Sequence, residues 1–169
     1  MLRTLALSLI ALAYVAPAVA QNRVSYFPVA PGSGAHDVAP APDGSVYYSA
    51  QMQGALGRID PKTGKDEHIA IGSGSAPHGV VVGPDGSPWL TDGGLNAIAR
   101  YDIKAKKFDY FALPPQMPSA NLNTGVFDKD GVYWFTGQNG VHGSVDPRSG
   151  KVQSWKSPRR GSYGITVTP

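Results

Sequence analysis

A repeat of about 42 residues limits what this chain can fold into more strongly than any other feature of its sequence. Residues 35–48 read AHDVAPAPDGSVYY and residues 77–90 read PHGVVVGPDGSPWL, so these two copies are shifted by 42 positions. A third copy at 124–136 (TGVFDKDGVYWFT) keeps the Asp-Gly turn, and a fourth begins at residue 163. Because the turn residues recur at a nearly fixed spacing, each copy is expected to form the same structural unit.

Within one copy the pattern is that of a small antiparallel sheet. The second copy has a β-branched run at 80–82 and a Pro-Asp-Gly turn at 84–86, followed by expected strands at 89–91, 97–102 and 108–113. No window of the chain after residue 20 has a helical period. Four antiparallel strands in roughly 40 to 45 residues, with an aromatic residue on the second strand, are typical of a β-propeller blade. The aromatic residues at that repeat position are expected to pack between blades: Tyr47, Trp89 and Trp134.

We therefore predict an all-β fold, a β-propeller built from four-stranded antiparallel blades. The blades are expected roughly at 35–72, 77–114 and 123–158, and the first strand of a fourth is expected from residue 162. Propellers close with about four to eight blades, so the ring is expected to be incomplete and the chain to be an N-terminal fragment. Its open strand edges and apolar faces are expected to need missing blades or self-association to cover them.

The first 20 residues have the features of a secretory signal peptide. Arg3 is followed by an apolar stretch at 5–15 and by small residues at 18–20, and we predict cleavage before Gln21. A transmembrane anchor is the alternative, but the apolar stretch is shorter than the about 20 residues that span a bilayer. The partial propeller at 21–169 is thus expected to be periplasmic or secreted, without membrane association after cleavage. The chain has no cysteine, so its stability must come from a core and hydrogen-bonded sheets.

The charge of the chain does not favour nucleic acid as a partner. The formal net charge is +3, from 15 Lys and Arg against 12 Asp and Glu. The one basic cluster, Lys156 with Arg159 and Arg160, is expected to be a solvated turn. We predict no nucleic-acid binding.

Polar residues just before the innermost strand of each blade are candidates for a ligand site, because these positions converge on the axis of a propeller. Small-molecule sites usually contain polar groups that converge on one opening. The alternative is that these side chains only hydrogen-bond neighbouring blade loops. The candidates are His36, His78, Asn123, Thr124 and Tyr163. Asp92 is a weaker candidate, either for a metal ligand or for a loop cap, since one carboxylate does not make a site for a hard cation.

Several motifs resemble the streptogramin B (virginiamycin B) lyase family: Pro-His-Gly-Val at 77–80, Gly-Pro-Asp-Gly at 83–86, Trp-Leu-Thr-Asp at 89–92, Ala-Arg-Tyr-Asp at 99–102 and Leu-Gly-Arg-Ile-Asp-Pro at 56–61. The resemblance covers essentially all of the chain after residue 20. It implies a seven-bladed ring and an enzyme that linearises a cyclic depsipeptide by Mg²⁺-dependent C–O elimination. In that reaction the metal polarises the ester carbonyl and a His removes the adjacent α-proton.

The resemblance also carries site residues, position by position. The catalytic His of the family stands in a Glu-Pro-His-Gly motif; His78 matches that position, but Ala76 replaces the Glu. Asp92 matches a metal-binding carboxylate at the end of a second strand, and Tyr163 is nearest to a substrate-facing Tyr. The family's catalytic blades would follow residue 169, so no residue here is assigned as catalytic. Mg²⁺ is expected in the complete protein, and the 169-residue chain alone is predicted to be inactive.

Three functions stay open at this point. The leading one is an exported lyase-like propeller that acts on a small cyclic ester or lactone. A lactone hydrolase resembling the gluconolactonases would need Glu, Asn and Asp ligands, of which only Asn123 and Asp92 are plausible. A non-catalytic propeller that binds a ligand or a protein is favoured by Ala76 and by the export signal.

Overall fold

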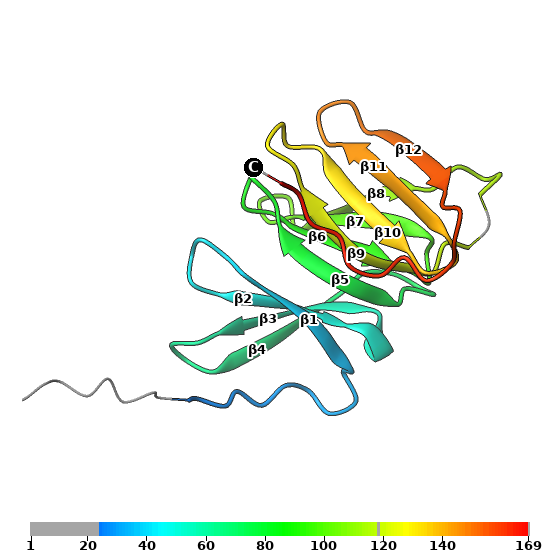
Figure 1. Ribbon diagram of the computed structural model, residues 1–169. Helices are drawn as coiled ribbons and strands as arrows, with labels where there is room; N and C mark the ends of the chain where they lie inside the picture. The colour runs from blue at the N-terminus through cyan, green and yellow to red at the C-terminus, as the bar shows by residue number, and fades with distance from the viewer. Residues whose placement is uncertain (1–23, 118, 169) are drawn as a thin grey trace, which may run out of the picture.

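The computed structural model describes residues 24–117 and 119–168, and strands form about half of that part. The strands fall into three antiparallel sheets of four, each in sequence order (Figure 1). The first sheet holds β1 (Ala35–Pro40), β2 (Val46–Ala50), β3 (Ala55–Asp60) and β4 (Lys65–Ala70). The second holds β5 (Pro77–Val82), β6 (Pro88–Asp92), β7 (Ala97–Asp102) and β8 (Lys107–Ala112). The third holds β9 (Leu122–Phe127), β10 (Tyr133–Gly137), β11 (Val141–Asp146) and β12 (Lys151–Lys156).

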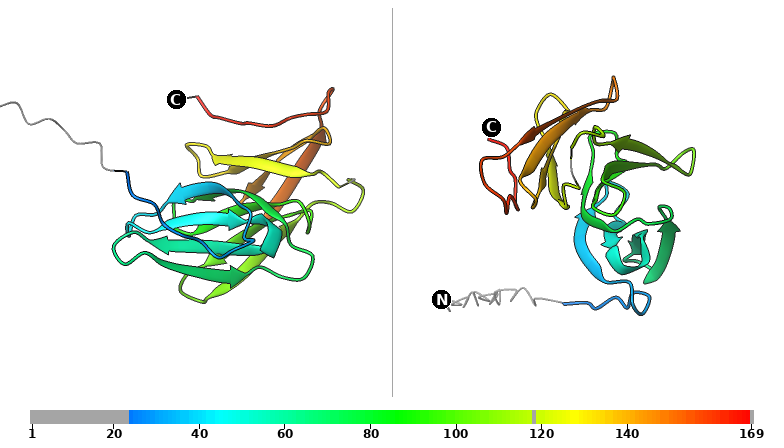
Figure 2. Two further views of the ribbon diagram at one scale, coloured as in Figure 1. Left: turned by 90° about the horizontal axis from the view of Figure 1, so that it is seen from below. Right: turned by 90° about the vertical axis from the view of Figure 1, so that its right-hand side faces the viewer.

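The three sheets stand one after another in an open arc, which the right-hand view of Figure 2 shows from the side. The first strands of the sheets, β1, β5 and β9, contact one another in turn. This arrangement confirms the predicted all-β fold of four-stranded antiparallel blades, without a closed ring. The predicted signal peptide lies outside the described residues. The described part also contains no helix long and apolar enough to cross a membrane.

The turn between the first two strands of a blade follows from its Asp-Gly sequence. In the first blade Gly44 has a φ of 85°, which a residue without a side chain adopts at no steric cost. The carboxylate of Asp43 accepts hydrogen bonds from the backbone N–H and the hydroxyl of Ser45, and these bonds lower the Asp43 pKa to about 2. Gly86 in the second blade has a φ of 80°. The recurring Asp-Gly sequence therefore corresponds to a recurring turn conformation.

Apolar cores lie between neighbouring blades. Tyr47 of the first blade packs with Val80 and Leu90 of the second, and Trp89 of the second packs with Tyr133 and Phe135 of the third. The expectation that Tyr47 and Trp89 pack between blades is thus confirmed. Trp134, at the same repeat position, lies outside both clusters and stacks on Trp155 of its own sheet at 6.2 Å between ring centroids.

The prediction that a fourth blade begins with a strand from residue 162 is wrong. Residues 162–168 are not a strand, although the carbonyl of Tyr163 accepts a hydrogen bond of 2.5 Å from the Thr136 hydroxyl. A strand needs a ladder of backbone hydrogen bonds to a partner strand, and no described strand pairs with this segment. The segment therefore lies beside the third blade without regular pairing.

A hydroxyl on the second strand of each blade bonds to the part of the chain that follows, which is the next blade for the first two blades and the segment 162–168 for the third. Each hydroxyl accepts a hydrogen bond from a backbone N–H in the first strand of its own blade. It donates a hydrogen bond to a backbone carbonyl in the next repeat. The three hydroxyls are those of Ser49, Thr91 and Thr136; the N–H groups are those of Asp37, Gly79 and Thr124, and the carbonyls those of His78, Asn123 and Tyr163. The distance from hydroxyl to carbonyl oxygen is 2.5 Å in each case. The blades are thereby held in register at the positions from which the candidate site is built.

Candidate functional site

The candidate site residues lie on β-bulges in the first strands of the blades. In the first blade two residues, His36 and Asp37, stand opposite the single residue Ser49 of the second strand. The second and third blades repeat this irregularity. Residues 78–79 stand opposite Thr91, and residues 123–124 stand opposite Thr136. A bulge interrupts the alternation of side chains along a strand and re-aims them. The fold therefore turns polar side chains out of the blades at equivalent points.

The predicted residues form one continuous cluster. The rings of His36 and His78 are 3.9 Å apart between centroids, and Tyr163 meets His78 edge-on at 6.1 Å. The side-chain nitrogen Nδ2 of Asn123 lies 3.1 Å from Nε2 of His78, and the Thr124 hydroxyl donates to Oδ1 of Asn123 at 2.8 Å. The structure thus brings together all five candidates from three blades and the segment that follows them.

Asp37 belongs to this cluster and was missed by the sequence reasoning. Its Oδ1 lies 2.8 Å from Nδ1 of His36, and both side chains are about one third exposed, at 34% and 38%. At the equivalent position the second blade has Gly79, where an added Cβ would stand 2.5 Å from the carbonyl oxygen of Asn123. An Asp where the neighbouring copy requires a Gly is the signal that could have identified it.

The electrostatic setting disfavours the charged form of the His78 imidazole. Burial lowers its pKa, the neighbouring His36 lowers it further, and Asp37 acts weakly in the opposite direction. Its Nδ1 atom is buried and has no hydrogen-bond partner among the described residues. A neutral ring with one free nitrogen can accept a hydrogen bond, donate one or bind a metal, depending on its tautomer.

Asp92 is not part of the cluster. Its carboxylate is fully buried, accepts a hydrogen bond from the Ser75 hydroxyl and accepts three more from backbone N–H groups. Those N–H groups belong to Ala76, Gly94 and Leu95, at 2.9, 3.0 and 3.0 Å. The contacts are those of the loop-cap alternative, and they leave little of the carboxylate free for a metal.

The family resemblance implies Mg²⁺, and the cluster offers few of the ligand atoms that this ion prefers. Among the described residues, His36, Asp37 and His78 form the one group of three His, Cys, Asp or Glu side chains whose donor atoms lie close enough to hold an ion. Mg²⁺ prefers about six oxygen ligands in octahedral geometry, whereas this group offers two imidazoles and one carboxylate. The residues of this chain therefore do not fit Mg²⁺.

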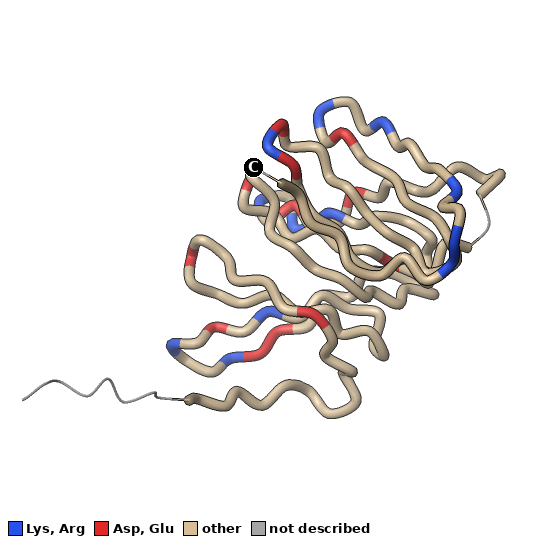
Figure 3. Tube along the Cα trace, viewed as in Figure 1, with Lys and Arg blue, Asp and Glu red and all other residues tan. Residues whose placement is uncertain are grey.

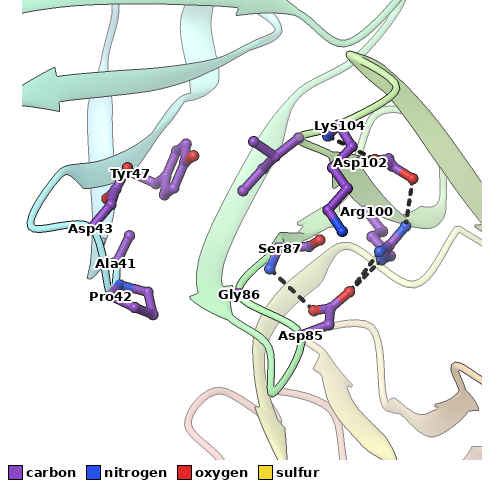
Figure 4. Close-up of a pocket in the computed structure, with 11 residues that line it drawn as sticks. Ala41, Pro42, Asp43, Tyr47, Asp85, Gly86, Ser87, Arg100, Asp102 and Lys104 are labelled. Carbon is purple, nitrogen blue, oxygen red and sulfur yellow. Dashed lines mark hydrogen bonds and ion pairs between the residues drawn. The ribbon is translucent and has the colours of Figure 1, made fainter.

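A separate groove lies between the first and second blades, beyond the C-terminal ends of β1 and β5 and away from the bulges (Figure 4). It has a volume of about 550 Å³ and is lined by the Asp-Gly turns of both blades, and no candidate site residue lines it. The Arg100 guanidinium at its wall pairs with Asp85 at 2.6 Å and with Asp109 at 3.0 Å. Burial raises the Asp85 pKa, but hydrogen bonds from Arg100 and Ser87 outweigh that effect and lower it.

Charged side chains do not gather on one face. Figure 3 shows Lys and Arg interspersed with Asp and Glu over the strands and outer turns. The carboxylates that line the groove are paired with arginines of the chain, Asp43 with Arg58 and both Asp85 and Asp102 with Arg100. The bulge cluster is therefore the stronger candidate for a site.

Fold and cluster together define an arc of a β-propeller whose innermost strands gather polar groups. Solved structures show which propellers it resembles. A catalytically inactive virginiamycin B lyase from Staphylococcus aureus, determined with quinupristin, is 27% identical with a TM-score of 0.68, and the match covers 76% of this chain and 43% of the lyase. A streptogramin B lyase structure is 23% identical with a TM-score of 0.71 over 79% of this chain and 44% of that one.

These matches confirm the resemblance that the motifs indicated, and they show a lyase-like propeller fold. The chain spans less than half of the length of the lyases that it matches. A protein of unknown function from Bacteroides caccae shares the fold at 18% identity and a TM-score of 0.56, with 79% of this chain and 50% of that one covered. No protein-family model and no curated protein matches the chain.

Proposed function

We propose that this chain forms three blades of an exported lyase-like propeller, periplasmic or secreted, that binds a small cyclic ester, either a depsipeptide or a lactone. The observation that carries the proposal is the cluster of His36, His78, Asn123 and Tyr163 on successive bulges of a lyase-like fold. In the complete propeller the ring of the ligand is opened by C–O elimination. A base removes a proton from the carbon next to the one that carries the ester oxygen, the alkyl C–O bond breaks, and an alkene and a carboxylate result without consumption of water.

The cluster supplies the means to hold such a ligand. Tyr163 is 55% exposed and His36 presents a partly exposed ring, so both can donate a hydrogen bond to an ester or amide carbonyl. Asn123 is buried and its side chain is fixed by Thr124 and His78. The aromatic rings add apolar surface next to these polar atoms, which is the usual composition of a ligand site.

No step of the elimination is assigned to a metal on this chain, because the cluster does not fit Mg²⁺. Any Mg²⁺ of the complete propeller is proposed to be held by ligands outside these blades. The open faces of the arc need cover as well. Trp155 on the third blade is 41% exposed, and we propose that further blades or a second copy pack there.

The test uses quinupristin as the probe, with the 169-residue chain and its variants. We expect saturable binding, seen as a change in tryptophan fluorescence, that weakens at least fivefold in Tyr163→Ala and His78→Ala. His142→Ala is the matched control, since His142 lies on β11 and stacks on Trp155. Equal affinity in all four proteins, or no binding, would refute the proposal.

Mass spectrometry of the same mixtures with Mg²⁺ tests the reaction. An elimination product has the mass of the intact ring, whereas hydrolysis adds the mass of water. We expect no ring opening by this chain alone, because none of its residues is assigned as the base. Ring opening by the chain would place the catalytic group within these blades and overturn that assignment.

The second candidate function is a propeller that binds without catalysis. It is supported by Ala76, which stands where the lyase motif has a Glu, and whose N–H donates to Asp92 instead. A full-length protein that binds the cyclic ester but never opens it would favour this function. The lactone-hydrolase alternative is the weakest, because the hydrogen bonds of Asp92 go to the segments just before β5 and just after β6 and none goes to Asn123.

A further inference from the structure

The geometry points to a site for Zn²⁺ or a similar transition metal, held by His36, Asp37 and His78 between the first and second blades. The donor atoms of these three side chains all lie within 4.8 Å of one another. This inference goes beyond the proposed function, because it concerns a cation that the chain binds by itself, whatever organic ligand or reaction the complete propeller has.

The backbone explains why the three side chains meet. In a regular strand the neighbours His36 and Asp37 would point to opposite faces of the sheet. The bulge opposite Ser49 removes that alternation, and the two side chains contact each other at 2.8 Å. His78 comes from the equivalent bulge of the next blade, and its backbone carbonyl is held by the Ser49 hydroxyl at 2.5 Å. The two bulges are thus fixed to each other, with β1 and β5 in contact (Figure 1).

The donor set selects the class of metal. Two imidazole nitrogens and one carboxylate oxygen are typical ligands of Zn²⁺ and of neighbouring metals such as Co²⁺ and Ni²⁺. Donors about 2.1 Å from a tetrahedral ion stand roughly 3.4 Å apart, so the side chains need only a small closure from their present separation. Three protein ligands leave a fourth position for water or for an oxygen atom of a ligand.

The contacts around the cluster show which atoms can share an ion. Nδ1 of His36 and Oδ1 of Asp37 lie 2.8 Å apart, and an ion that replaces the proton between them needs them only slightly farther apart. On His78 the Nε2 atom lies 3.1 Å from Nδ2 of Asn123, and the buried Nδ1 atom has no hydrogen-bond partner in the described part of the chain. A metal bound at that nitrogen would satisfy an atom that is otherwise costly to bury. It would leave the proton of the His78 ring on Nε2, so the Asn123 amide would turn its oxygen toward that N–H and orient the ring as an outer-shell partner.

The test is metal binding by the untagged full chain after chelator treatment, with Zn²⁺ followed by calorimetry and Co²⁺ by its visible absorption. We expect one ion per chain and a tetrahedral Co²⁺ spectrum. His36→Asn, His78→Asn and Asp37→Asn are each expected to weaken Zn²⁺ binding tenfold or more, because each removes a ligand and the loss of even an outer-shell partner costs about 10- to 100-fold. A hundredfold excess of Mg²⁺ is expected to leave Zn²⁺ binding unchanged.

His142→Asn is the matched control, because that His lies outside the cluster and should leave affinity and stoichiometry as in the parent chain. Circular dichroism checks the fold of each variant, and Asp37→Asn, a change of one partly exposed group, serves if a His variant is unfolded. The absence of saturable one-to-one binding would overturn the proposal, as would equal affinity in the parent and in His36→Asn. In either case the cluster is only a hydrogen-bonded contact between blades. Binding of quinupristin is measured without metal, so the failure of one proposal leaves the other standing.

Discussion

Replacement of Thr91 by Val is the sharpest test of how the blades are joined. The Thr91 hydroxyl is fully buried, accepts from the Gly79 N–H at 2.9 Å and donates to the Asn123 carbonyl at 2.5 Å. Val keeps the volume but removes both bonds, and it leaves two buried backbone groups unpaired, each at a cost of about 1 to 3 kcal/mol. The additional buried methyl offsets about 0.8 kcal/mol. We expect the free energy of unfolding to fall by about 1 to 5 kcal/mol.

The assay is urea unfolding of the full chain at 25 °C, followed by tryptophan fluorescence, since Trp89 is buried between the second and third blades. Thr91→Ser is the matched control: it retains the hydroxyl, as Ser49 does at the same position of the first blade, and it loses only a methyl group, about 1 kcal/mol. If Thr91→Val is no more destabilising than Thr91→Ser, the hydroxyl does not join the blades as argued.

Three further changes test other contacts by their effect on stability. In Gly143→Ala the new Cβ would lie 2.4 Å from the ring of Phe135, and denaturant unfolding should show a loss of about 1 to 3 kcal/mol, whereas Gly164→Ala, in open space, should change nothing measurable. Asp92→Ala removes the acceptor of three backbone N–H groups and should cost roughly 3 kcal/mol or more in the same assay; a loss below that of a surface substitution would contradict the loop-cap role. The Asp85 pKa is lowered in the folded chain, so its contribution to stability is present above the ordinary value of 3.8 and lost as the pH falls through the lower folded pKa. The stability deficit of Asp85→Asn, measured by unfolding at pH 7 and at pH 2, should therefore shrink at the acidic end, and a pH-independent deficit would refute this.

Much of the fold could be predicted because the repeat marks local chemistry. The Asp-Gly pairs require turns, and Gly44 adopts the positive φ that such a turn needs. The aromatic position of the repeat predicted contacts between blades, and Tyr47 and Trp89 make them. Strand pairing beyond the repeat was not predictable in the same way: Tyr163 begins a segment with a strand-like sequence, but a strand depends on a distant partner, and none of the described strands provides it.

The candidate site could be predicted in position but not in chemistry. Equivalent repeat positions indicated that His36 and His78 would approach each other, and their rings do. Asp37 was missed because a repeat comparison emphasises what the copies share, and this residue differs from its counterpart Gly79. The role of the Thr91 hydroxyl was also invisible, since it depends on a bulge whose register no local pattern fixes.

The hydroxyl contact between blades has a consequence for how the chain opens. Because each blade is tied by the same contact to its neighbour only, the arc behaves as a linear array with nearest-neighbour coupling, in which the ends fray first. Thr91 lies in the central blade, which is covered on both sides. Backbone amides of β5 and β6 are expected to exchange with deuterated solvent most slowly, and those of β12, at the outer edge of the third sheet, much faster.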